Sequence, residues 1–244
     1  MPSLNYAIPL LPRRPVAGAG VLLVLFLAWV AGCAKPVASA VGQSKVAPKT
    51  PADFEPEVAA FEAKGLGPLG NEVIFFTGSS SIRLWALDQA FPKLKTCNLG
   101  FGGSRLVDLN HFAPRLILPC RPKRLVVYEG DNDLNEGFSV DAVIHQAELF
   151  AKTMAQKLPG TRIWWLAIKP SVARVSQMPA QKQANQRLRK LCEQSARQAT
   201  FVDTFTPLLG PDGQPDPTLF LEDNLHLNEK GYARWKVLLE PLLK

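Results

Sequence analysis

Two segments that lie far apart in the chain carry side chains that could together transfer an acyl group. Asp223 stands three residues before His226, in the sequence Asp-Asn-Leu-His just ahead of the last helical segment. An aspartate at this spacing can accept the Nδ1 proton of the imidazole and leave Nε2 free as a base. Ser80 lies in the run Gly78-Ser79-Ser80-Ser81, between a strand-like and a helical segment. A hydroxyl at a helix N-terminus lies where backbone N–H groups and the helix dipole can stabilise an anion, although helix capping alone is the simpler interpretation of this run.

Two further segments follow strand-like runs and could add hydrogen-bond donors. The glycine-rich sequence Asn98–Ser104 includes Gly103, and glycine lets the backbone approach a ligand closely. It lacks the lysine of a phosphate-binding loop and the acidic residue of a dinucleotide site. In Glu129–Asp133, the amide of Asn132 could donate into a crevice, with turn formation as the alternative.

The elements that must position these residues alternate between strand-like and helix-like hydrophobic periods. This pattern predicts an α/β protein, a three-layer α/β/α sandwich with a five-stranded parallel, flavodoxin-like sheet. In such a sheet the ligand crevice lies beyond the carboxyl ends of the strands, where all four segments fall. The predicted strands are Val73–Thr77, Leu94–Leu99, Arg124–Glu129, Arg162–Ile168 and Thr200–Asp203, and the predicted helices between and after them are Ile82–Phe91, Leu106–Leu118, Val140–Leu158, Pro179–Gln198 and Asn228–Leu243.

Taken in order, the four segments resemble the blocks of the SGNH hydrolases, also called GDSL esterases. Ser80 matches the family's nucleophile, Gly103 the second-block glycine and Asn132 the third-block asparagine. Asp223 and His226 match the family's DxxH pair. The resemblance implies a serine esterase that forms an acyl-enzyme on Ser80, with the Ser80 N–H, the Gly103 N–H and the Asn132 amide around the oxyanion.

The first block departs from the family pattern, because serines replace the Asp and Leu of Gly-Asp-Ser-Leu. We choose Ser80 as the nucleophile because it lies two residues after Gly78, and a subgroup of these esterases has the same serine run. The resemblance covers Val73–Leu243. That subgroup often has a segment like the one from Lys169 to Arg174, which implies that both cations border the crevice and bind substrate. Solvated loop charges are the alternative.

The substrate and partners are less defined than the chemistry. The site could act on a lipid or short acyl ester or on an O-acetylated glycan, and the sequence does not decide. A non-catalytic envelope lipoprotein that binds glycan or peptide is the alternative from another class, but it would have no need of a base-orienting pair. No metal or organic cofactor is implied, since the chain has three histidines and its cysteine spacing matches no zinc pattern.

Charge and cysteine content bear on the binding partners of the protein and on its disulfides. The net charge is +7, but the basic residues are scattered, so nucleic acid is not an expected partner. The oligomeric state is unknown. Cys97, Cys120 and Cys192 remain in the expected folded part, and an oxidising compartment would permit one disulfide that the sequence does not pair.

The N-terminal segment has the features of a secretory signal. Arg13 and Arg14 precede the apolar run Val16–Val30, which is about 15 residues long and short of the roughly 20 that span a bilayer. Val-Ala-Gly-Cys33 then resembles the lipobox of bacterial lipoproteins. We therefore expect a signal peptide at 1–32, a lipidated Cys33 with a flexible tether at 33–52, and the hydrolase domain at 53–244. The residue after Cys33 is Ala34 and not the aspartate associated with inner-membrane retention in many Gram-negative bacteria, so the resemblance to lipoproteins implies an outer-membrane anchor with the domain facing the periplasm.

The lipid anchor can be tested at its acceptor atom. Cys33→Ser should abolish labelling by a palmitate analogue, because the thiol is the group that is acylated. Metabolic labelling followed by gel detection measures this, with Cys97→Ser as the matched control that keeps its label. Equal labelling of the wild type and of Cys33→Ser would contradict the predicted lipid anchor at Cys33.

Overall fold

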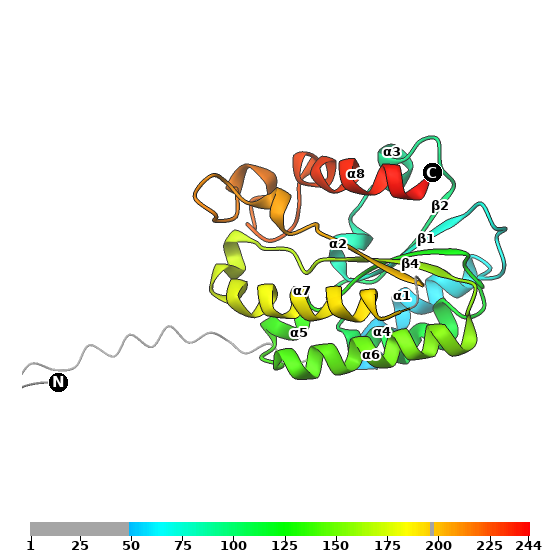
Figure 1. Cartoon of the computed structure of the whole chain (residues 1–244). Helices are drawn as coiled ribbons and strands as arrows, with labels where there is room; N and C mark the ends of the chain where they lie inside the picture. Colours follow the sequence, from blue (N-terminus) through cyan, green and yellow to red (C-terminus); the bar gives the residue numbers. More distant parts are fainter. Residues whose placement is uncertain (1–48, 196–197) are drawn as a thin grey trace, which may run out of the picture. The chain divides into compact units, whose positions relative to one another are not determined.

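Five parallel strands form one sheet in the order β2-β1-β3-β4-β5 (Figure 1). The computed structural model describes residues 49–195 and 198–244, so the predicted signal peptide, Cys33 and residues 33–48 of the predicted tether lie outside the described residues. The strand order is that of the flavodoxin-like folds, so the predicted fold is confirmed. The strands are β1 Ile74–Gly78, β2 Thr96–Gly100, β3 Arg124–Tyr128, β4 Arg162–Leu166 and β5 Ala199–Val202.

Side chains along each strand alternate between two hydrophobic cores. On β3, Leu125 and Val127 belong to one core and Val126 and Tyr128 to the other, and all four are fully buried. A parallel sheet covered on both faces requires strands that are apolar on both sides. Full burial of each such aliphatic side chain stabilises the folded state by about 1.5–3 kcal/mol relative to leaving it exposed.

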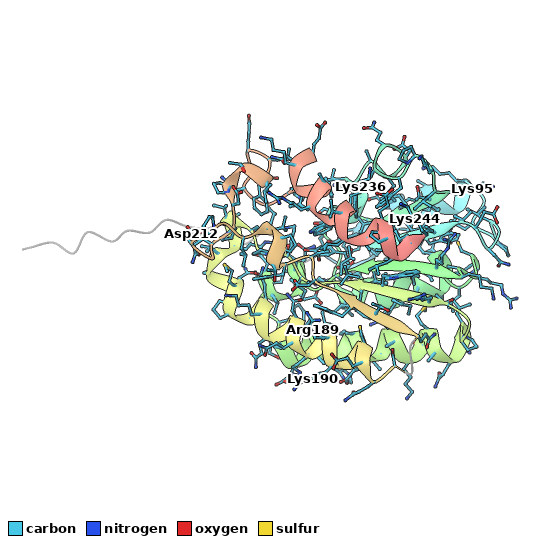
Figure 2. All side chains as sticks on the ribbon, turned by 45° about the horizontal axis from the view of Figure 1, so that its top comes forward. Lys95, Arg189, Lys190, Asp212, Lys236 and Lys244 are labelled. Carbon is cyan, nitrogen blue, oxygen red and sulfur yellow. The ribbon has the colours of Figure 1, made fainter. Side chains whose placement is uncertain are left out.

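Helices cover the two faces of the sheet and complete the three layers. The first face carries α1 Pro51–Ala63, α4 Leu106–Leu116, α6 Val140–Lys157 and α7 Met178–Glu193. The second carries α2 Ser80–Arg83, α3 Leu87–Ala90 and α8 Glu229–Leu243. Figure 2 shows α7 with Arg189 and Lys190 on one side of the sheet and α8 with Lys236 and Lys244 on the other. Shorter helical turns are α5 Asp131–Asn135, η1 Val172–Gln177, η2 Thr206–Leu208 and η3 Pro217–Leu219.

The first helix begins two residues before the expected start of the domain at residue 53. Helix α1 starts at Pro51, inside the segment expected to be tether. The backbone N–H of Thr50 donates to Asp53 Oδ2 at 2.7 Å, and proline is well suited to the first helical position. Phe54 and Val58 anchor the helix, because both are fully buried in the first core.

The helix predicted at Ile82–Phe91 is in fact two short ones, α2 and α3. Asn98 on β2 donates through Nδ2 to the carbonyl oxygens of Ile82 and Trp85, at 2.7 and 3.3 Å. These bonds satisfy the carbonyls that a continuous helix would use for its own backbone. A side chain from a neighbouring strand therefore ends the helix.

The cysteines of the described region are all free thiols. Cys120 and Cys192 are buried, and burial raises their pKa values to about 11 and about 12. Neutral, enclosed thiols of this kind react slowly. Within residues 49–195 and 198–244, no cluster of three His, Cys, Asp or Glu side chains could hold a metal ion. Among the same residues, no helix has the length and hydropathy of a membrane span.

Candidate active site

Ser80 stands at the tight turn that links β1 to α2. Gly78 has φ of +134°, and a Cβ there would lie 1.9 Å from the carbonyl oxygen of Tyr128. Only glycine fits this position, which lets the neighbouring backbones approach closely. The N–H of Ser79 donates to that same carbonyl at 3.2 Å. The turn thus places Ser80 as the first residue of α2 at the carboxyl end of the sheet.

A chain of two hydrogen bonds joins three predicted residues that are widely separated in sequence. The Oγ of Ser80 lies 2.9 Å from Nε2 of His226. Nδ1 of the same ring lies 2.5 Å from Oδ2 of Asp223. With the proton on Nδ1, Nε2 accepts the hydroxyl proton, so the imidazole is placed to act as a base toward Ser80.

The loop before α8 holds the Asp223 carboxylate in position. Its Oδ1 accepts the backbone N–H groups of Leu225 and His226, each at 2.9 Å. Burial by itself would raise the pKa of Asp223, but the hydrogen bonds from the His226 side chain and from these two N–H groups lower it to about 2. Asp223 is therefore ionised at neutral pH and stabilises the imidazolium that forms when His226 takes a proton.

Donors for a developing negative charge, the donor side of the site, lie at the start of α2 and on the segments that follow β2 and β3. Ser80 is the first residue of α2, so its N–H has no acceptor within that helix. Gly103 has φ of +84°, in the loop that follows β2. Asn132 Nδ2 donates one hydrogen to the carbonyl oxygen of Ser104 at 2.9 Å, which leaves its second hydrogen free to meet an oxyanion.

A buried carboxyl group supports the loop that carries Gly103. The Ser104 hydroxyl lies 2.5 Å from Glu129 Oε1 and 3.0 Å from the carbonyl oxygen of Phe101. Burial, followed by the nearby charge of Asp133, raises the pKa of Glu129 well above its ordinary value. A protonated Glu129 can donate to the hydroxyl while the hydroxyl donates to Phe101, so both contacts are satisfied. Ser104 is thereby fixed, and with it the carbonyl that orients Asn132.

The two cations predicted to bind substrate lie in a buried charge cluster instead of an open crevice. Lys169 is 1% exposed, and its Nζ contacts Asp131 Oδ2 at 3.3 Å and donates to the carbonyl oxygen of Leu225 at 2.8 Å. Arg174 contacts Asp131 Oδ1 at 2.9 Å through Nη1. Its Nη2 donates to Asn132 Oδ1 at 3.1 Å. The placement of Lys169 leaves it no surface for substrate, and both cations are bonded to groups that position the site.

The structure joins Ser80, His226 and Asp223 by hydrogen bonds and places Gly103 and Asn132 after the carboxyl ends of β2 and β3, at the same edge of the sheet as Ser80. Sequence reasoning missed Glu129 and Asp131, the carboxyl groups beside Asn132. Both stand in the segment Glu-Gly-Asp-Asn-Asp at the end of β3. Their signal was acidic residues directly after a strand that is apolar on both faces, since such residues are buried and need partners.

The sequence model of the GDSL-like Lipase/Acylhydrolase family matches residues 79–234. This match includes every residue of the hydrogen-bonded site, and the chain belongs to this family. The fold and the family together place the protein in the class of carboxylic ester hydrolases. No curated protein matches the chain.

Solved structures of the same fold come from several bacteria. A Streptococcus pneumonia protein described as a platelet activating factor has a TM-score of 0.69 and 20% identity, with 79% of this chain and 94% of that chain covered. A GDSL-like lipase from Bacteroides thetaiotaomicron has a TM-score of 0.65 and 15% identity, covering 80% and 98%. An acetylxylan esterase from Geobacillus stearothermophilus has a TM-score of 0.58 and 14% identity, covering 72% and 95%. At these identities the likeness shows a shared fold.

The position of Arg174 predicts a role in orienting Asn132. Arg174→Gln should lower kcat by about tenfold to a hundredfold and leave KM nearly unchanged. The decrease should not exceed the roughly hundredfold decrease in kcat that follows removal of an oxyanion donor, because Arg174 only orients that donor. Steady-state kinetics on p-nitrophenyl acetate measure both constants. Arg187→Gln, at a surface pair with Asp141, is the control and should change neither. A raised KM with kcat preserved would instead make Arg174 a substrate contact.

The hydrogen-bonded chain predicts unequal and non-additive losses. His226→Ala should lower kcat by about 10⁶-fold, because no other group can take the Ser80 proton, and Asp223→Ala by about 10⁴-fold. The double variant should be no worse than His226→Ala, since an orienting carboxylate then has nothing to orient. Hydrolysis of p-nitrophenyl acetate measures each loss. The exposed His145 gives the control, because His145→Ala should retain full activity.

If the two single losses multiplied in the double variant, the residues would act independently. The Asp223 to His226 hydrogen bond would then have no catalytic role.

Proposed function

We propose that the protein is a serine ester hydrolase that forms an acyl-enzyme on Ser80. The observation that carries this proposal is the continuous hydrogen bonding from Ser80 through His226 to Asp223. The family assignment supports it, since the family comprises lipases and acylhydrolases. A binding protein would gain nothing from an ionised carboxylate that orients an imidazole toward a hydroxyl.

The proposed reaction has two displacements that share one base. His226 Nε2 takes the Ser80 proton as Oγ attacks the ester carbonyl, and the protonated ring then gives that proton to the leaving alcohol. Water, activated by the same nitrogen, releases the acid from Ser80. The oxyanion of each tetrahedral intermediate would meet the N–H groups of Ser80 and Gly103 and the free hydrogen of Asn132. Each such donor is worth about 3 kcal/mol of barrier, or roughly a hundredfold in rate.

Two substrate classes fit this chemistry. One is a lipid or short acyl ester, and the other is an O-acetylated glycan, which the acetylxylan esterase with the same fold supports. We also propose that Cys33 anchors the protein by lipid to the bacterial envelope, facing the periplasm. The support for this is the small-residue pair before Cys33 and the length of the apolar run.

The choice among three adjacent serines can be tested directly. Ser80→Ala should lose nearly all esterase activity, while Ser79→Ala and Ser81→Ala should keep most of it, because Ser79 and Ser81 are each 2% exposed and only Ser80 bonds to His226. Labelling by a fluorophosphonate probe measures the nucleophile without a substrate. Labelling of Ser80→Ala as strong as the wild type would assign the nucleophile to another serine.

A further inference from the structure

Lys49 lies against the loop that carries Gly103, although it belongs to the segment predicted to be tether. Its Nζ donates to the carbonyl oxygen of Gly102 at 2.6 Å. The same ammonium group lies 4.9 Å from the centroid of the Phe54 ring, whose face attracts a cation. Gly102 and Phe54 are both buried, so an exposed lysine reaches two fixed parts of the domain.

The main chain at Lys49 is held by a buried arginine. Arg105 is 7% exposed, and its Nη2 donates to the carbonyl oxygen of Lys49 at 2.6 Å. Carboxylates fix the rest of the guanidinium, with Nε 2.8 Å from Asp108 Oδ2 and Nη1 2.9 Å from Glu136 Oε2. The side chain of Lys49 therefore starts from a backbone position that is already set, so less entropy is lost when it is ordered.

The bond from Lys49 to Gly102 determines the direction of the Gly103 N–H. A trans peptide unit is planar, so the carbonyl oxygen of Gly102 and the N–H of Gly103 point in opposite directions. A peptide unit between two glycines has no Cβ on either side to restrict its rotation, and Gly103 has φ of +84°. A donor on the carbonyl oxygen therefore opposes rotation of this unit, and with it reversal of the N–H.

The other backbone group of Gly102 is also occupied. Its N–H donates to Glu57 Oε2 at 3.3 Å, and Glu57 Oε1 lies 3.5 Å from Nη1 of Arg83. A Cβ on Gly102 would lie 2.5 Å from the guanidinium carbon of Arg83, so the loop fits closely against this side chain. The N–H of Gly103, in contrast, donates to no group in the described part of the chain, which leaves it for an oxyanion.

We propose that Lys49 is a positioning residue of the active site, which directs the Gly103 N–H toward the oxyanion by holding the Gly102 carbonyl. The inference rests on the proposed ester hydrolysis at Ser80 and adds a residue from outside the hydrolase domain that the sequence predicts. A positive charge on the carbonyl oxygen also polarises the peptide unit, which strengthens its N–H as a donor. Lys49 acts through Gly103 and does not contact the substrate.

The test is kinetic and uses the full chain. Lys49→Met keeps most of the side-chain length but removes the ammonium group, so it should lower kcat on p-nitrophenyl acetate by about tenfold to a hundredfold. KM should be nearly unchanged, because the lost interaction is made only as the oxyanion develops. Lys49→Arg keeps a cationic donor and should restore most of kcat.

A transition-state mimic gives a readout that a purely structural role of Lys49 would not change. The boron atom of phenylboronic acid accepts the Oγ of Ser80, whose proton passes to His226, and the tetrahedral adduct is negatively charged like the reaction intermediate. The inhibition constant of phenylboronic acid should rise in Lys49→Met by about the same factor as kcat falls.

Lys64 provides the matched control at the opposite end of α1. Its Nζ lies 5.7 Å from the centroid of the Phe61 ring. Lys64→Met therefore removes the same charge and the same kind of aromatic contact, at a position that the length of the helix separates from Gly102. This variant should keep the wild-type kcat, KM and inhibition constant.

The outcomes separate this inference from the function beneath it. If Lys49→Met kept the wild-type kcat or inhibition constant, or raised KM with kcat preserved, the esterase would stand and the positioning role would be overturned. Equal falls in kcat for Lys49→Met and Lys49→Arg would assign the effect to packing at residue 49, and would also overturn it. If the wild type hydrolysed no ester, the proposed ester hydrolysis itself would fail.

Discussion

The active site depends on one buried carboxylate, Asp131, held between two cations. Lys169 and Arg174 come from the chain after β4, while Asp131 is the first residue of α5, which follows β3. Burial alone would raise the pKa of Asp131, but the two cations keep it low, so the group is charged. Taking such charges out of water costs several kcal/mol per ion, and only close partners offset that cost. Because Lys169 also bonds to the carbonyl of Leu225 and Arg174 to Asn132, the cluster joins the loop of the base to the donor side of the site.

The two sides of the active site differ in their exposure to solvent. The donor side is supported by fully buried polar groups, with Glu129 beneath Ser104. The base side is a partly exposed loop, in which the side chain of Asp223 is 47% exposed. Such a division suits the proposed acyl transfer, in which the oxyanion donors are fixed before the charge develops and water reaches the imidazole for the second displacement.

Much of this arrangement could be predicted from the sequence, because it depends on local patterns. The alternation of periods predicted the parallel sheet, and the rule that crevices lie at strand ends placed Ser80, Asn132 and His226 together. What could not be predicted depends on contacts between distant residues. Asn98, on the neighbouring strand β2, divides the helical segment after Ser80 into two helices. Lys169 turns inward because it pairs with Asp131, which lies 38 residues earlier in the chain. A lysine alone in a loop segment carries no sign of such a partner, and exposure is its ordinary state.

The loop that carries the base also holds Asp223, the most exposed of the five site residues. Between η3 and α8 the two ends of this loop are buried at Phe220 and Leu227, which form an antiparallel bridge. The stretch from residue 221 to residue 224 is exposed, and backbone and side-chain hydrogen bonds from Ala173 to Asn224 and from Lys169 to Leu225 tie this part of the loop to the chain after β4. Segments built in this way open at lower free energy than the strands beneath them, and their amide protons exchange sooner. Warming should therefore separate the imidazole from Ser80 while the sheet is still folded, so the temperature at which turnover fails lies below the temperature at which the domain unfolds.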